Sequence, residues 1–89
     1  MIETPITIIN KLGLHARAAA KLVSTASEYN SDVKIRKGEQ TVDGKSIMSV
    51  MMLAASQGTE IDLIIDGDDE EEAREALVAL IDDYFGEGE

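Results

Sequence analysis

One histidine, His15, stands directly before an alanine-rich stretch with helical spacing, and Arg17 follows two residues later. The unpaired N–H groups of a first helical turn attract an anion, and their partial positive charge disfavours a protonated imidazole. A neutral imidazole keeps one nitrogen lone pair, which is a nucleophile. The pattern predicts that His15 accepts a phosphoryl group held by the N–H groups of Ala16 and Arg17 and by the Arg17 guanidinium. The alternative is an exposed loop histidine beside an ordinary helix-start arginine.

Ser46 is a second candidate, because it follows Gly44 and Lys45 and precedes an apolar helical run. Its structural role would be an N-cap, in which the hydroxyl accepts a hydrogen bond from a backbone N–H. A phosphoserine at that position would also be favoured by the helix terminus. The sequence leaves both roles open, a cap and a regulatory switch.

The run after Ser46 is rich in methionine, with Met48, Met51 and Met52 among other apolar residues. A helix of one or two turns cannot direct all of these side chains inward. Methionines fill cores but also form adaptable docking surfaces, so a buried and an exposed interpretation both stand. The exposed interpretation groups apolar residues from the helix and from the loop before His15: Leu12, Leu14, Ile47, Met48 and Met51.

Other site classes find no support in the composition. The chain has no cysteine and one histidine, which excludes thiolate sites and any site needing two imidazoles. The consecutive acids Asp68–Glu72 lie around a helix rather than converging, so they predict a solvated first turn and not a metal site. There is no glycine-rich phosphate loop and no Ser–His–Asp set. We expect no cofactor and no metal.

The net charge of −10 is unevenly distributed. Residues 1–59 carry seven basic and five acidic side chains, a net +2, whereas residues 60–89 carry one basic and thirteen acidic, a net −12. With so acidic a second half and so few aromatic residues, nucleic acid and anionic membrane are unexpected partners. No apolar run has the length of a membrane span, and the N-terminus lacks the pattern of a signal peptide. These features predict a cytoplasmic protein.

The elements that must position His15 follow from hydrophobic periodicity. With 89 residues and no linker, the chain is expected to be one domain, residues 1–89. The order β-α-β-β-α-β-α predicts the α+β class: an open-faced sandwich with a four-stranded antiparallel sheet and three helices on one face. The expected elements are a strand over 2–8 with Pro5 at an edge, a helix from Ala16 to about Asn30, strands over 32–36 and 40–42, a helix from Ser46, a strand over 61–65 and a helix from Asp68 to Gly86.

The expected buried stripes follow the helical spacing. In the first helix they are Ala16, Ala19, Ala20, Leu22, Val23 and Ala26. In the last helix they are Ala73, Leu77, Leu80, Ile81 and Tyr84.

Two segments resemble motifs of a known family. Residues 10–19, NKLGLHARAA, resemble the active-site motif of the HPr family, the histidine-containing phosphocarriers of the bacterial phosphotransferase system. Residues 44–51, GKSIMSVM, resemble its regulatory-serine segment, and length and element order match over essentially the whole chain. One departure is Ala18, where the family usually has a first-turn proline. Alanine is a good helix former, so the site is expected to survive, and such variants resemble proteobacterial forms that include the nitrogen-branch NPr type.

The resemblance implies a function. Enzyme I would phosphorylate His15 on Nδ1, Arg17 would assist, and the group would pass to a histidine of a IIA domain. A dedicated HPr kinase/phosphorylase would modify Ser46. The protein would be a substrate of its partners rather than an enzyme, and a monomer. Partner contact is expected from the apolar group above and from basic side chains that steer acidic surfaces: Lys11, Arg17, Lys21 and Lys45.

Two further hypotheses belong to other classes. A regulatory binding module of the same fold would not transfer phosphate, and the presence of His15 argues against it. A small ferredoxin-like ligand-binding domain would have a similar order of elements. Such a domain would be marked by a cofactor motif, and none is visible.

Overall fold

Four strands form one antiparallel sheet in the order β1-β4-β2-β3 in the computed structural model, which describes residues 1–89. The strands and helices follow one another along the chain in the order that the sequence predicts. The elements are β1 (Ile2–Thr7), α1 (Ala16–Ala26), β2 (Asp32–Lys37), β3 (Gln40–Asp43), α2 (Ile47–Met52), β4 (Glu60–Asp66), α3 (Glu70–Asp82) and a final 3-10 turn (Tyr84–Gly86).

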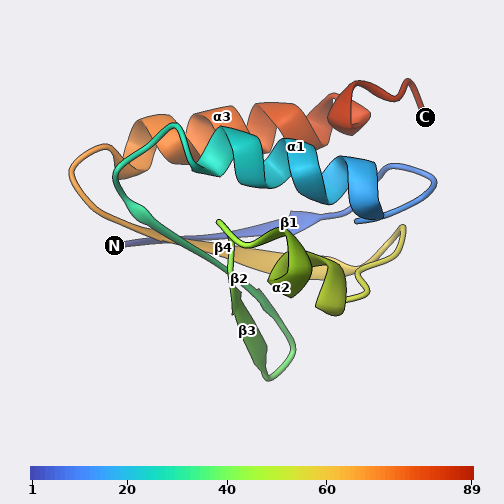
Figure 1. The fold of residues 1–89 in the computed structure, drawn as a ribbon, viewed down its shortest axis with the longest axis horizontal. Helices are drawn as coiled ribbons and strands as arrows, with labels where there is room; N and C mark the ends of the chain where they lie inside the picture. Colours follow the sequence, from blue (N-terminus) through green and yellow to red (C-terminus); the bar gives the residue numbers. More distant parts are fainter.

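The helices cover one face of the sheet. Figure 1 shows α1 and α3 side by side above the strands, with the shorter α2 against α1 and beside β3. The same view places the C-terminal segment near the loop that leads into α1, and a hydrogen bond from Lys11 N–H to the Glu89 carbonyl (3.2 Å) joins the two. The predicted open-faced α+β sandwich is confirmed.

Apolar and polar residues alternate along the strands, so the sheet has one apolar face and one polar face. Val33 and Ile35 of β2, and the odd-numbered residues of β4, are buried beneath the helices. On the open face, Arg36 pairs with Glu3 at 2.7 Å and with Asp62 at 3.1 Å, which links three strands. Pro5 lies in β1, an edge strand where its missing N–H costs no sheet hydrogen bond.

Three helix predictions need correction. In α1, Ala16 is exposed although it is expected in the buried stripe, and Ala18, which is not expected there, is buried. Helix α3 ends at Asp82 rather than Gly86, and the backbone of Tyr84 and Phe85 adopts positive φ values of 57° and 53°. This reversal exposes Tyr84 and buries Phe85 in the core, the opposite of what continued helical spacing would give.

Helix boundaries differ by a few residues. Helix α1 ends at Ala26, and the chain passes through turns before Asp32 rather than continuing to Asn30. The acids that lie in the first turn of α3 are Glu70, Glu71 and Glu72. No cluster of three or more histidine or acidic side chains converges as a metal site would require.

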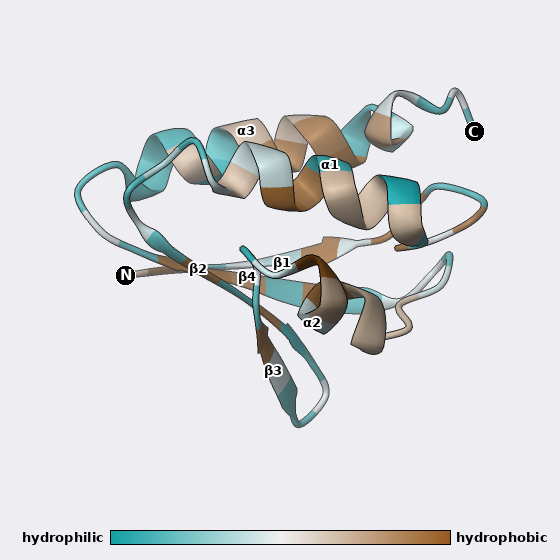
Figure 2. Cartoon of the chain, viewed as in Figure 1, coloured by the Kyte–Doolittle hydropathy of each residue, from teal (hydrophilic) through white to brown (hydrophobic).

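Hydropathy differs sharply between the helices. Figure 2 shows α2 in apolar colours along most of its length, whereas α1 and α3 each carry a polar side. None of the helices combines the length and the apolar character that crossing a membrane demands.

Candidate functional site

His15 is the N-cap residue of α1, with an extended backbone (φ −75°, ψ 179°). Its carbonyl accepts the first helical hydrogen bond, from Ala19 N–H at 2.8 Å. The N–H groups of Ala16, Arg17 and Ala18 therefore have no backbone partner, as the first turn of a helix requires. The His15 side chain does not cap them, so an anion can approach these donors.

The approach to His15 is shaped by Gly13. This residue has φ +68°, and a Cβ there would lie 2.6 Å from the Ala55 carbonyl oxygen. The neighbouring Leu14 N–H donates to that same carbonyl at 2.8 Å. Only glycine permits this turn and this close approach, which together fix the direction in which His15 leaves the loop.

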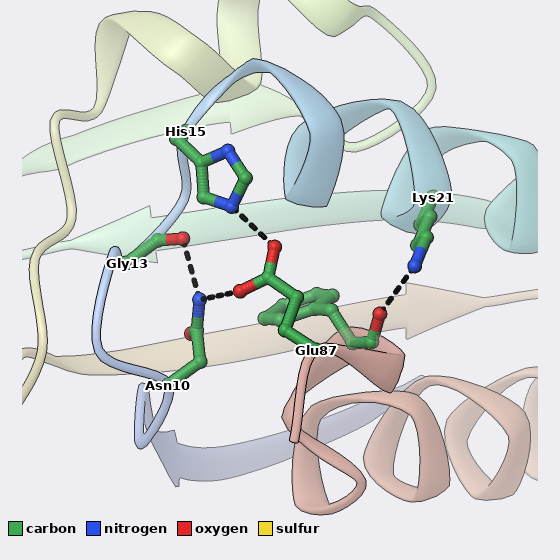
Figure 3. A network of polar contacts seen from close by, with 6 residues as sticks. Asn10, Gly13, His15, Lys21 and Glu87 are labelled. Atoms are coloured by element: carbon green, nitrogen blue, oxygen red, sulfur yellow. Dashed lines mark hydrogen bonds and ion pairs between the residues drawn. The ribbon is translucent and has the colours of Figure 1, made fainter. Parts of the chain in front are cut away.

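The imidazole contacts the C-terminal segment. Its Nε2 pairs with the Oε2 atom of Glu87, 72 residues away in sequence, while Nδ1 makes no hydrogen bond (Figure 3). The other carboxylate oxygen, Oε1, accepts from Asn10 Nδ2 at 3.1 Å, and the same Nδ2 donates to the Gly13 carbonyl at 2.8 Å. The His15 side chain is 24% exposed and that of Glu87 is 9% exposed, so the contact is shielded from solvent on the Glu87 side.

Two anchors bring Glu87 to this position. Phe85 is fully buried in the core, and its carbonyl accepts a hydrogen bond from Lys21 Nζ of α1 at 2.6 Å (Figure 3). Short turns follow, in which Gly86 N–H donates to Asp83 and Glu87 N–H to Tyr84, both at 2.9 Å. The C-terminal segment is thus held between α1 and the loop before His15.

The pKa of Glu87 lies below its ordinary value. Burial of the carboxyl acts to raise that pKa, but the hydrogen bonds from His15 and Asn10 and the electrostatic interactions with His15 and Arg17 outweigh burial. Glu87 is therefore an ionised carboxylate at neutral pH, and it can only accept hydrogen bonds.

Arg17 lies beside the same residues without a hydrogen bond of its own. It is exposed, and together with Leu12, Glu87 and Glu89 it lines a hollow of about 270 Å³. A larger hollow of about 470 Å³ lies across the molecule between β1 and α3 and contains none of the predicted site residues. The structure therefore places His15, Arg17 and the free N–H groups of α1 in one region, as predicted.

Ser46 is the N-cap of α2. Its Oγ accepts a hydrogen bond from Ser49 N–H at 3.3 Å, so the predicted capping role is confirmed. Lys45 is tied down beside it, with Nζ donating to the Tyr29 carbonyl at 2.8 Å. Lys21 is engaged in the same way at Phe85, so both lysines hold the fold together while keeping their charge near the surface.

The exposed apolar patch forms mainly on α2. Met48 is 71% exposed and Met52 69%, with Ile47 and Met51 also exposed, while Val50 faces the core. We refer to Ile47, Met48, Met51 and Met52 as the α2 apolar surface. Leu12 is exposed at 62%, but Leu14 is only 5% exposed, so its predicted place in the patch is wrong. Leu14 turns inward because its backbone is bound to Ala55.

Sequence reasoning missed two members of the site, Asn10 and Glu87. The tail Gly86-Glu87-Gly88-Glu89 has the composition of a solvated terminus, and no spacing rule links it to His15. The departure at Ala18 is compatible with the geometry, because the N–H that proline would lack is unused in the first turn of α1.

Comparison with known proteins gives one consistent answer. A family model described as the PTS HPr component phosphorylation site matches residues 2–83. The phosphocarrier protein HPr of Neisseria meningitidis serogroup A is 57% identical over 89 residues, 100% of both chains. The phosphocarrier protein NPr of Shewanella violacea is 42% identical over 86 residues, 97% of this chain and 94% of that one.

Solved structures agree. HPr from Thermoanaerobacter tengcongensis is 52% identical, with a TM-score of 0.94 over 98% of both chains. A dimer of that protein gives a TM-score of 0.79 over 98% of this chain and 100% of the other. The match to the family model, the full-length identity and the shared fold coincide with a surface histidine at a helix N-terminus, and the chain belongs to the HPr family of phosphocarrier proteins of the phosphotransferase system.

Proposed function

We propose that Nδ1 of His15 accepts a phosphoryl group from phospho-enzyme I and delivers it to a histidine of a IIA domain. The observation that carries this proposal is the placement of a partly exposed imidazole, with Nδ1 unengaged, beside the unpaired N–H groups of α1. Those N–H groups and Arg17 supply donors for the three phosphoryl oxygens.

The chemistry needs little else. The Nδ1 lone pair attacks phosphorus as the bond between phosphorus and the phosphorylated group of enzyme I breaks, and the electron pair of that bond returns to enzyme I. Transfer to a IIA domain is the same exchange with His15 as the donor: a histidine of that domain attacks phosphorus, and the electron pair of the N–P bond returns to Nδ1 of His15. Phosphoryl transfer relies on positioning and charge stabilisation, so a protein of this size can be a carrier without a cofactor of its own. It is a substrate of its partners, not an enzyme.

The test uses purified enzyme I, labelled phosphoenolpyruvate and two proteins, the parent and His15→Ala. We expect the parent to take up label in an acid-labile, base-stable form and His15→Ala to take up none. The partly exposed ring makes few contacts that the fold depends on, so both proteins should melt at similar temperatures. Label persisting at the parent's rate in His15→Ala would refute the proposal.

Ser46 is proposed as a regulatory site, modified by an ATP-dependent HPr kinase/phosphorylase. Its support is the half-exposed hydroxyl at the start of α2, where N–H groups tolerate an added phosphate. We also propose that the carrier acts in the cytoplasm as a monomer. Light scattering across a tenfold range of concentration should return a constant mass near 9.6 kDa, and a doubled mass would replace the monomer with a dimer.

A further inference from the structure

We infer that Glu87 is a positioning residue for His15, holding the proton on Nε2 so that the lone pair of Nδ1 remains free. This inference rests on the proposed phosphoryl acceptance at His15. It assigns a role to the C-terminal segment, whose residues lie outside the motif around His15 and beyond the stretch matched by the family model.

For a neutral imidazole, the geometry leaves one arrangement of hydrogen atoms. The ionised carboxylate of Glu87 can only accept, so the His15 nitrogen that contacts it must donate, and that nitrogen is Nε2. Asn10 donates to the second oxygen and thereby prevents the carboxylate from rotating away. Figure 3 shows Glu87 between the two side chains, reaching one with each oxygen.

The same contact supports the transfer step. When Nδ1 forms its bond to phosphorus, the ring retains the Nε2 proton and gains positive charge. The Glu87 carboxylate faces that charge throughout, as the carboxylate of a catalytic triad faces its histidine, and the proton stays on Nε2. Other charged groups lining the hollow are Arg17, which favours the incoming phosphoryl oxygens, and Glu89, whose side chain makes no hydrogen bond.

The substitution Glu87→Gln gives a sharp test because Asn10 dictates how the new amide lies. Asn10 Nδ2 donates, so the amide must direct its oxygen toward Asn10 and its NH₂ toward His15. Nε2 must then accept, and the ring proton moves to Nδ1, which removes the nucleophile. Glu87→Ala removes the contact without imposing the wrong tautomer, so it should be the milder change.

The measurement combines ring spectra with rates. Nitrogen-15 NMR of the unphosphorylated proteins, at a pH where the ring is neutral, should show a proton on Nε2 in the parent and on Nδ1 in Glu87→Gln. Acceptance from phospho-enzyme I should slow by about tenfold in Glu87→Gln, the size of effect expected from losing one charged hydrogen bond. Glu87→Ala should fall between the parent and Glu87→Gln. The matched control, Glu72→Gln, removes the same charge from an exposed side chain of α3 and should behave as the parent.

The outcomes separate the two proposals. Identical ring spectra in Glu87→Gln and Glu72→Gln, or identical rates in these two variants, would overturn the role of Glu87. A rate in Glu87→Ala as low as that in Glu87→Gln would also overturn it, because the tautomer would then be irrelevant. If the parent itself takes up no label, the proposed function fails, while the ring spectra still test the contact. Melting temperatures of all variants identify any loss of folding.

Discussion

Opposite charges meet beside His15, where Glu87 holds Nε2 and Arg17 lines the same hollow. The two side chains have different freedom. Glu87 is bound at both oxygens, whereas the guanidinium of Arg17 is exposed and makes no hydrogen bond. An incoming phosphoryl group brings negative charge, which Glu87 disfavours and Arg17 favours. Arg17 is therefore the residue that can reorient toward the phosphoryl oxygens without breaking a contact of the free protein.

At this scale we predict that Arg17→Ala slows His15 phosphorylation without abolishing it. The N–H groups of α1 remain, and the lost charged hydrogen bond should cost about 1.5–3 kcal/mol, a slowing of at least tenfold. The rate of label uptake with purified enzyme I measures the effect. Arg74→Ala is the control, since it removes the same charge from α3, beside the remote hollow. Equal rates for the two variants would show that Arg17 is a solvated residue at the helix start with no part in phosphorylation of His15.

At the scale of elements, Asp69 holds together two of the segments that connect helices and strands. Its carboxylate accepts hydrogen bonds from the N–H groups of Asn30 (2.8 Å) and Ser31 (2.9 Å) and from the Ser31 hydroxyl. This fastens the segment between α1 and β2 to the segment between β4 and α3. The hydrogen bond from the Ser31 hydroxyl, followed by that from Asn30, lowers the pKa of Asp69 below its ordinary value of 3.8.

The predicted consequence is a pH-dependent loss of stability in Asp69→Ala. A carboxyl whose pKa is lower in the folded state stabilises the protein above its unfolded value, and the effect disappears as the pH falls through the folded value. The difference in free energy of unfolding between parent and Asp69→Ala should be constant from neutral pH to about 5 and shrink toward pH 2. Denaturant titrations at each pH measure it.

The adjacent Asp68 provides the control for that titration. It is exposed and makes no side-chain hydrogen bond, so Asp68→Ala should match the parent within about 0.5 kcal/mol. A difference for Asp69→Ala that stays constant into strong acid would mean that the ionised carboxylate is not what stabilises the two connections.

At the scale of the whole molecule, the exposed α2 apolar surface lies on the helix that packs against α1, the helix that begins at His15. Exposed methionines adapt to different surfaces, which suits a carrier that must meet a donor and an acceptor in turn. The C-terminal part of the chain is strongly acidic, while residues 1–59 have a net charge of +2. We expect acidic partner surfaces to approach the more basic side.

The prediction at this scale is that Ser46→Asp leaves the fold intact and slows phosphorylation of His15. The start of α2 accommodates the negative charge, so the melting temperature should stay near the parent's. The same charge stands next to Ile47 and Met48, where it should repel an acidic partner. The measurement pairs a thermal melt with label uptake from enzyme I. Ser24→Asp, at an exposed position of α1, is the control, and equal uptake in the two variants would leave Ser46 as an N-cap only.

The sequence alone determined the order of the strands and helices along the chain, the open-faced sandwich, the place of His15 at the start of a helix and the cap at Ser46. These features depend on interactions between near neighbours: alternation along a strand, the spacing of a helix, and a hydroxyl three residues from the N–H it caps. Pro5 at an edge strand follows for the same reason, since one missing donor restricts where the residue can lie.

Only the tertiary structure decided the features that depend on distant residues. Leu14 is buried because Ala55 holds its backbone, and Phe85 replaces Tyr84 in the core because the chain reverses after α3. The partner of His15 lies 72 residues away, on a tail whose composition alone predicts solvation. Such a contact exists because the buried Phe85 anchors the tail beside α1, and no local pattern of residues encodes where that anchor leads.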